Sequence, residues 1–182
     1  MHDEIAWVRQ IAQGDEEAFE KLFRCYAPRI FRFALGYLND GSLAEEVVQE
    51  TMIAVWKGAK HYKEQSQVSS WILGIARNKA LDRVRALQRE PELLQEKLDR
   101  RASSRATPEQ IAQRETQIER VRRALEKLSP EHREVMLLAF YNDLSYSEIA
   151  QILNCPEGTV KSRVYYAKEQ LKKILSEDGE TV

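Results

Sequence analysis

The segment from Ser145 to Ala167, SYSEIAQILNCPEGTVKSRVYYA, constrains the fold of this chain more than any other. Ser145 and Glu148 have the spacing of a capping box, which predicts the start of a short helix. Asn154 follows at a position that needs a left-handed backbone, which Asn tolerates better than most residues. A longer helix is then predicted over about 157–175. A short helix, a tight turn and a longer helix together indicate a helix-turn-helix.

The second of these helices has one apolar side and one polar side on a wheel of about 100° per residue. The apolar seam consists of Val160, Val164, Ala167 and Leu171. The opposite side consists of Gly158, Ser162, Tyr165, Tyr166 and Glu169, with Lys161 on one shoulder and Arg163 with Thr159 on the other. Small polar residues between cations suit a helix that reads the DNA major groove and holds phosphates at its edges. A solvated surface helix is the alternative.

Composition favours an all-α protein. The chain has 182 residues, 43% of them hydrophobic, with only 7 Gly and 5 Pro. Long stretches are rich in good helix formers, and the length fits one medium domain or two small ones. The net charge of −1 gives no overall basic field, so binding to nucleic acid must depend on local clusters of Lys and Arg.

The cysteines and the chain start predict a soluble cytoplasmic protein. Cys25 and Cys155 lie far apart and outside any metal-binding spacing, so neither a disulfide framework nor a zinc site is expected, and no cofactor is expected. The start, MHDEIAWVRQ, lacks the apolar core of a signal peptide. The longest purely apolar run, Val135–Tyr141, is too short to span a bilayer, so no membrane insertion is expected.

The apolar pattern divides into two blocks. The first runs from about Glu4 to Leu87 and contains a helical stripe around Tyr26 that resumes at Ile30. Pro28, between them, suits the first turn of a new helix. A second helix is predicted to start at a capping box of Ser42 and Glu45 and to reach about Lys57. A polar loop and a helix over 70–87 complete this block.

A polar stretch over 88–106 is predicted to be a linker, with a transient helix near 93–98. The second block opens at Thr107-Pro108, which combines an N-cap with a proline at the first helical position, and Ser129-Pro130 repeats the pattern. The helices predicted for this block span about 108–127, 130–141, 146–153 and 157–175.

Several segments resemble the extracytoplasmic-function sigma factors, a compact group of the bacterial RNA polymerase sigma family. LSYSEIAQILNCPEGTVKSRV resembles region 4 of that family. Three further segments resemble region 2, namely GDEEAFEKLFRCYAPRIFRFA, AEEVVQETMIAVWK and SSWILGIARNKALDRVR. The resemblance covers about 14–175 and implies an all-α fold of two small helical domains. These are a region 2 bundle over 1–87 and a region 4 helix-turn-helix domain over 107–182, joined by a flexible linker over 88–106.

The resemblance also implies a function. Such a protein directs core RNA polymerase to promoters by recognising their −10 and −35 elements, melts the promoter and is controlled by an anti-sigma factor. It would dock on the clamp helices of the polymerase through Glu45, Glu46, Gln49, Glu50 and Trp56. Plain solvation is the alternative for these carboxylates. Region 4 would bind the −35 element through Thr159, Lys161, Ser162, Arg163, Tyr165 and Tyr166.

The loop YKEQSQVSS and the helix after it resemble the segment that captures an unstacked base of the −10 element. Polar edges would come from Lys63, Gln65, Ser66, Ser69, Ser70 and Asn78, and phosphate contacts from Arg77, Lys79, Arg83 and Arg85. Trp71 fits the core better than a stacking platform, while Asn78 and Asp82 equally fit helix–helix hydrogen bonds. The family often has Gly at Asn154 and a basic residue or His near Tyr165 and Tyr166, so no promoter consensus is carried over.

Two other function classes are considered. A stand-alone regulator would bind a palindrome as a dimer through its helix-turn-helix, but the first block has no dimer seam or ligand-pocket signature. An enzyme is disfavoured because His2, His61 and His132 are scattered and no phosphate-binding loop or nucleophile–base set is visible. The sequence therefore predicts a promoter-specificity subunit that is not an enzyme.

Overall fold

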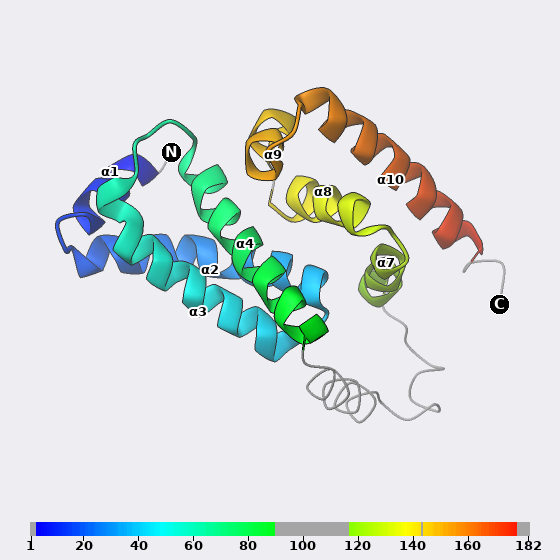
Figure 1. Ribbon diagram of the computed structural model, residues 1–182, viewed down its shortest axis with the longest axis horizontal. Helices are drawn as coiled ribbons and strands as arrows, with labels where there is room; N and C mark the ends of the chain where they lie inside the picture. The colour runs from blue at the N-terminus through cyan, green and yellow to red at the C-terminus, as the bar shows by residue number, and fades with distance from the viewer. Residues whose placement is uncertain (1–2, 90–116, 143, 178–182) are drawn as a thin grey trace.

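The computed structural model describes residues 3–89, 117–142 and 144–177, and these residues form helices without any strand (Figure 1). The N-terminal bundle consists of α1 (Glu4–Ile11), α2 (Glu16–Leu38), α3 (Gly41–Gly58), a 3-10 helix η1 (Ala59–His61) and α4 (Val68–Arg89). The C-terminal module consists of α7 (Gln117–Glu126), α8 (Pro130–Tyr141), α9 (Tyr146–Leu153) and α10 (Glu157–Glu177). The all-α prediction is confirmed. The predicted linker beyond residue 89, its transient helix and the start of the 108–127 helix lie outside the described residues.

The N-terminal bundle is built around α2, which packs against α1, α3 and α4. Its core contains the fully buried side chains Leu22, Tyr26, Ile30, Phe33, Val47, Val55, Ile72 and Leu73. Tyr26 also donates a hydrogen bond of 2.7 Å to Glu4, which ties the short helix α1 to the bundle. Burial and this hydrogen bond raise the pKa of Tyr26, so the phenol remains a donor.

Pro28 does not start a helix, contrary to the sequence-based prediction. Helix α2 continues through it from Glu16 to Leu38. A proline inside a helix removes one hydrogen bond and costs about 3 kcal/mol. Tyr26 and Ile30, on either side of it, are both fully buried, and each such side chain contributes about 1.5–3 kcal/mol. Packing of the two flanking turns therefore outweighs the local cost, and Pro28 itself stays exposed.

The N-cap of α3 lies two residues earlier than predicted, at Asp40 instead of Ser42. Asn39 closes α2 in the left-handed conformation, with φ of 53°, and Asp40 caps α3 by accepting a hydrogen bond of 2.9 Å from the Leu43 N–H. Ser42 lies inside the helix and is exposed. The carboxylate of Asp40 takes the position that the capping-box prediction gave to the hydroxyl of Ser42. The predicted end near Lys57 is confirmed.

The C-terminal module follows the sequence-based prediction closely. Ser129 caps α8, and Ser145 and Glu148 form the predicted capping box of α9. Asn154 ends α9 in the left-handed conformation, with φ of 50°. Helix α10 buries Val160, Val164 and Ala167 and leaves Leu171 half-buried, so the predicted seam faces the core. The helix-turn-helix prediction is confirmed.

The two halves of the chain pack directly against each other. Helix α8 lies against α2, and α9 lies against α4, so α8 and α9 stand between α4 and α10 (Figure 1). The two halves approach closely at Gly36 of α2, where a Cβ atom would lie 2.4 Å from Cδ2 of the fully buried Leu137. A side chain at position 36 would therefore require Leu137 or α2 to shift.

Candidate nucleic-acid and protein interfaces

Helix α10 presents a polar surface on the side opposite its buried seam. Tyr165 and Tyr166 are 62% and 58% exposed, and their rings meet edge to face at 5.4 Å. Lys161 and Ser162 are exposed as well, whereas Thr159 and Arg163 are half-buried. The predicted set for the −35 element thus lies together on one helix. It combines two large aromatic surfaces with cationic and hydroxyl groups, as base-edge and phosphate contacts require.

Local contacts hold several side chains of this surface in place. Lys161 forms an ion pair of 2.8 Å with Glu157, one turn earlier, and hydrogen bonding to that carboxylate raises the pKa of Lys161. Ser162 donates back to the carbonyl of Thr159 at 3.0 Å. Because exposed ion pairs within a helix are weak, Lys161 can exchange Glu157 for another anion at little cost.

The predicted −10 residues are distributed unevenly over the loop 62–67 and helix α4. Lys63, Gln65, Asn78 and Arg85 are exposed, and Ser66, Ser69, Arg77, Lys79 and Arg83 are half-buried. Ser70 differs from the others, because it is 5% exposed and its hydroxyl lies in the core without a hydrogen bond among the described residues. The structure therefore does not bring Ser70 to the same surface, and it is left out of the proposed site.

The loop itself is held at both ends. Trp71 stacks on Tyr62 at 4.7 Å, and the Tyr62 hydroxyl donates to the carbonyl of Ser66. Glu64, with φ of 57°, accepts hydrogen bonds of 2.7 and 2.8 Å from Arg9 on α1. The pKa of Glu64 is lowered by these hydrogen bonds from Arg9. Trp71 is half-buried in this packing, in keeping with its assignment to the core rather than to a free stacking platform.

The predicted polymerase-docking acids and phosphate-binding cations meet across α3 and α4. Arg83 pairs with Glu46 at 3.2 Å and also with Glu50, while Lys79 lies 3.5 Å from Glu50. These charges therefore partly neutralise one another. Glu45 and Gln49 remain exposed on the outer side of α3. Trp56 is half-buried and meets the ring of Phe19 edge to face at 5.1 Å.

Sequence reasoning missed the contacts that join the two halves of the chain. Arg77 on α4 donates to Glu134 on α8 at 2.7 and 3.3 Å, and Ser69 donates to Glu148 on α9 at 2.8 Å. These partners are 57 and 79 residues apart, so no periodicity or local motif could have paired them. Two residues predicted to contact promoter DNA are thus bound by the other half of the same chain.

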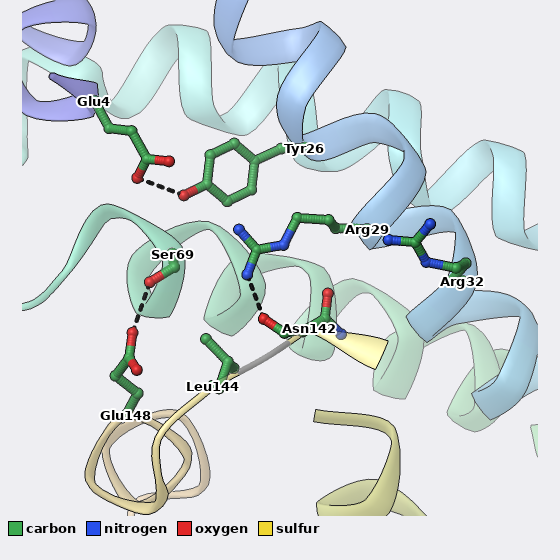
Figure 2. A pocket seen from close by; sticks show the side chains of 8 residues that line it. All are labelled: Glu4, Tyr26, Arg29, Arg32, Ser69, Asn142, Leu144 and Glu148. Atoms are coloured by element: carbon green, nitrogen blue, oxygen red, sulfur yellow. Dashed lines mark hydrogen bonds between the residues drawn. The ribbon is translucent and has the colours of Figure 1, made fainter. Parts of the chain in front are cut away.

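A polar cleft of about 360 Å³ lies between the two halves (Figure 2). It is lined by Glu4, Tyr26, Arg29, Arg32, Ser69, Asn142, Leu144 and Glu148. Arg29 crosses it and donates to the backbone carbonyl of Asn142 at 2.5 Å (Figure 2). Both cations, Arg29 and Arg32, come from α2, whereas the acids Glu4 and Glu148 come one from each half, so the cleft belongs to the junction between the halves.

Among the described residues, no group of His, Cys, Asp and Glu side chains is arranged to hold a metal ion. Cys25 and Cys155 are free thiols. His132 lies 3.0 Å from the side-chain oxygen of Gln170. A search of the described helices for a segment long and apolar enough to cross a membrane found none.

Comparison with known families accounts for both halves. The family model described as Sigma-70 region 2 matches residues 22–90, and that described as Sigma-70, region 4 matches residues 118–171. The ECF RNA polymerase sigma factor RpoE of Cereibacter sphaeroides is 35% identical over 179 residues, which cover 96% of each chain. This chain belongs to the extracytoplasmic-function (ECF) sigma factors. It is accordingly a promoter-specificity subunit that directs bacterial RNA polymerase in transcription initiation.

Other ECF sigma factors are similar over the same span. SigW of Bacillus subtilis is 27% identical over 176 residues, 92% of this chain and 94% of that protein. Among solved structures, CnrH in complex with the cytosolic domain of CnrY matches with a TM-score of 0.73 and 24% identity, over 96% of this chain and 98% of that one. This structural likeness supports the fold. The match over both halves favours a sigma factor over a stand-alone regulator.

Proposed function

We propose that this ECF sigma factor reads the −35 element with the outer side of α10. The observation that carries this assignment is the contrast between the two sides of the helix. Val160, Val164 and Ala167 are buried, whereas Lys161, Ser162, Tyr165 and Tyr166 face outward from a region 4 module. The tyrosine rings suit apolar contact with base edges, and Lys161, Thr159 and Arg163 suit phosphate contacts at the shoulders.

The −10 element is assigned to the loop 62–67 and α4. Lys63, Gln65, Ser66, Ser69 and Asn78 supply polar edges for an unstacked base, and Arg77, Lys79, Arg83 and Arg85 supply phosphate contacts. The stack of Tyr62 on Trp71 supports this role, because it fixes the position of the loop relative to the cations of α4. Capture of single-stranded DNA needs both a held loop and nearby positive charge.

Docking on the polymerase clamp helices is assigned to the outer side of α3. Glu45 and Gln49 are exposed there, and Glu46 and Glu50 lie beside them in contact with α4. Trp56 supports this surface by packing on Phe19. The two DNA-reading modules make few contacts each, so attachment to polymerase supplies the effective concentration that promoter binding requires.

Control by an anti-sigma factor is part of the same proposal. CnrH was solved with the cytosolic domain of CnrY, and the sigma factor RpoE of Bartonella quintana was solved with the anti-sigma factor NepR. We infer a comparable protein partner here, acting in the cytoplasm on a factor that performs no catalysis of its own.

The proposal is tested by reconstitution with core RNA polymerase. Core enzyme plus this protein should start transcription from a limited set of sites on fragmented genomic DNA of the source bacterium. Core enzyme alone should not use these sites. Replacing Arg163 by Ala should lower −35-dependent initiation by roughly tenfold, the loss of a DNA contact worth about 1–3 kcal/mol, and leave core binding unchanged.

The matched control is Arg24→Ala, which removes an exposed arginine of α2 that pairs only with Glu20 one turn away in the described structure. Initiation by this variant should equal that of the unaltered protein. Equal loss of core binding and of initiation in Arg163→Ala would assign the residue to folding. Absence of any sigma-dependent start site would overturn the proposed function.

A further inference from the structure

Among the described residues, Arg122 on α7 donates a hydrogen bond to Asn39 at the end of α2, and three other polar contacts join the N-terminal bundle to the C-terminal module. We call these three the interdomain latch. They are Arg77 to Glu134, Ser69 to Glu148, and Arg29 to the backbone carbonyl of Asn142. The contacts come from α2 and α4 on one side and from α8, α9 and the residue that follows α8 on the other. They therefore involve more than one helix on each side of the junction.

The ion pair is the most enclosed of these contacts. The side chain of Arg77 is 23% exposed and that of Glu134 only 7%. A charge pair withdrawn from water is stabilising only while it is complete, because removing one partner leaves the other charge buried without compensation. The junction thus holds Arg77 against Glu134 as long as the two modules stay together.

An apolar contact beside the ion pair brings the two modules into close packing. Gly36 on α2 lies against the fully buried Leu137, one turn along α8 from Glu134. A side chain at position 36 would occupy the space that Leu137 fills. The junction therefore depends on shape as well as on charge, and each can be altered separately.

The latch occupies part of the surface assigned to the −10 element, an assignment that rests on the proposed function. Glu134 accepts from Nε and Nη2 of Arg77, so its carboxylate already compensates the charge that a DNA phosphate would need. The packed C-terminal module also leaves the Arg77 side chain only 23% exposed. Ser69 is likewise engaged by Glu148. We propose that the C-terminal module acts as an intramolecular competitor of single-stranded DNA for α4, so that the closed chain inhibits itself.

Closure affects the two DNA-reading surfaces unequally. Lys161, Tyr165 and Tyr166 on α10 are exposed in the closed arrangement, since α8 and α9 are the helices that face the bundle. The −35 surface is therefore open while the −10 surface is partly covered. In a two-state equilibrium, the apparent affinity for single-stranded DNA equals the affinity of the open state multiplied by the fraction of molecules that are open.

The test uses the full-length chain with nitroxide labels on exposed Cys25 and on a cysteine introduced by Lys173→Cys, with Cys155 replaced by Ser. Pulsed electron paramagnetic resonance then measures the distance between the modules. Two variants open the junction independently. Glu134→Gln removes the charge of the pair, and Gly36→Leu places a side chain against Leu137 while raising the helix propensity of α2. Glu20→Gln, on the exposed surface of α2, is the control with the same charge change as Glu134→Gln.

We expect one narrow distance distribution for the parent and for Glu20→Gln, and a longer, broader one for both opening variants. Affinity for the oligonucleotide dT20, measured by fluorescence anisotropy, should rise roughly tenfold in both opening variants, as expected when a minor open state becomes dominant. Adding Arg77→Gln to Gly36→Leu should remove most of that gain. Circular dichroism confirms that each variant remains helical.

Unchanged distances in both opening variants would overturn the latch. Longer distances without a gain in dT20 affinity would overturn self-inhibition. If the gain in dT20 affinity persists after Arg77→Gln is added, DNA and the C-terminal module do not compete for Arg77, and the proposal as stated is overturned. Reconstituted transcription decides the proposed function separately, because it reports polymerase-dependent initiation and not the closure of the free chain.

Discussion

Asn154 shows how one residue sets the geometry of the DNA-reading unit. It is exposed and lies in the left-handed region, with φ of 50°, between the two helices of the helix-turn-helix. Because its side chain is exposed and not part of the core, the backbone conformation is the main requirement at this position. Residues branched at Cβ meet a steric penalty there that Asn and Gly avoid.

Substitution at Asn154 should therefore follow backbone preference. Asn154→Val should lower the free energy of unfolding by about 1–2 kcal/mol because of the left-handed φ, whereas Asn154→Gly should change it little. Urea denaturation followed by circular dichroism measures both. Equal stability of the Val and Gly variants would show that the turn relaxes and that its conformation is not constrained by the neighbouring helices.

The N-caps of α3 and α9 show how far a local motif predicts the start of a helix. The spacing of Ser and Glu predicted a capping box at both Ser42 and Ser145, and only the second is correct. At Ser42 the preceding residues Asn39 and Asp40 form a tighter connection, with Asn39 left-handed and Asp40 as the cap. Two capping side chains so close in sequence compete, and the structure selects the carboxylate.

The caps of α3 can be ranked by mutation. Asp40→Ala should lower the free energy of unfolding by about 0.5–2 kcal/mol, because the N–H of Leu43 loses its acceptor. Ser42→Ala, on the exposed surface, should change stability by less than about 0.5 kcal/mol. Urea titrations of the two variants give the comparison. The reverse order would restore the sequence-based assignment of Ser42 as the cap.

Most helices could be predicted from apolar periodicity because each buries one continuous face. The seam of Val160, Val164 and Ala167 is such a case, and it also located the exposed side of α10. Pro28 could not be placed in this way, because local propensity ends a helix there while the burial of Tyr26 and Ile30 continues it. The outcome depends on tertiary packing, which a local pattern does not contain.

At the scale of the whole molecule, the sequence indicated two modules and did not reveal their junction. The flexible linker over 88–106 stays a prediction, and the packing of α8 and α9 on α2 and α4 had no local signal in the sequence. Arg77 had the residue type of a phosphate ligand, and its pairing with Glu134 depends on a contact across 57 residues. Charge type was predictable from the sequence, and the partner of that charge was not.

The junction should also respond to pH through Glu148. Burial opposes ionisation of this carboxyl, but hydrogen bonds from Ser145 and Ser69, together with the charge of Arg29, hold its pKa below the ordinary value. The other carboxyl group in the polar cleft around Glu148 is that of Glu4. A carboxyl with a lowered folded-state pKa adds stability above its unfolded pKa, about 4.3, and loses that contribution as pH falls through the folded value.

The measurement is a comparison of the parent with Glu148→Gln. The free energy of unfolding should differ by about 1–2 kcal/mol near pH 7, since the variant loses a charged cap and a hydrogen-bond acceptor. This difference should stay constant down to about pH 5 and shrink below about pH 4 as the parent carboxylate is protonated. A difference that does not depend on pH would show that the charge of Glu148 is not what stabilises the chain.

The carboxylate of Glu148 has two roles. It accepts hydrogen bonds from Ser145 at the start of α9, and it accepts one from Ser69 across the junction between the two halves. Selection for a well-formed helix-turn-helix would preserve this acid in relatives whether or not their modules meet. Its presence in a family alignment therefore says nothing about closure. Glu134 has no such second role in the described contacts, where its carboxylate pairs with Arg77, so gain or loss of an acid at that position is the evolutionary trace by which closing and non-closing lineages can be told apart.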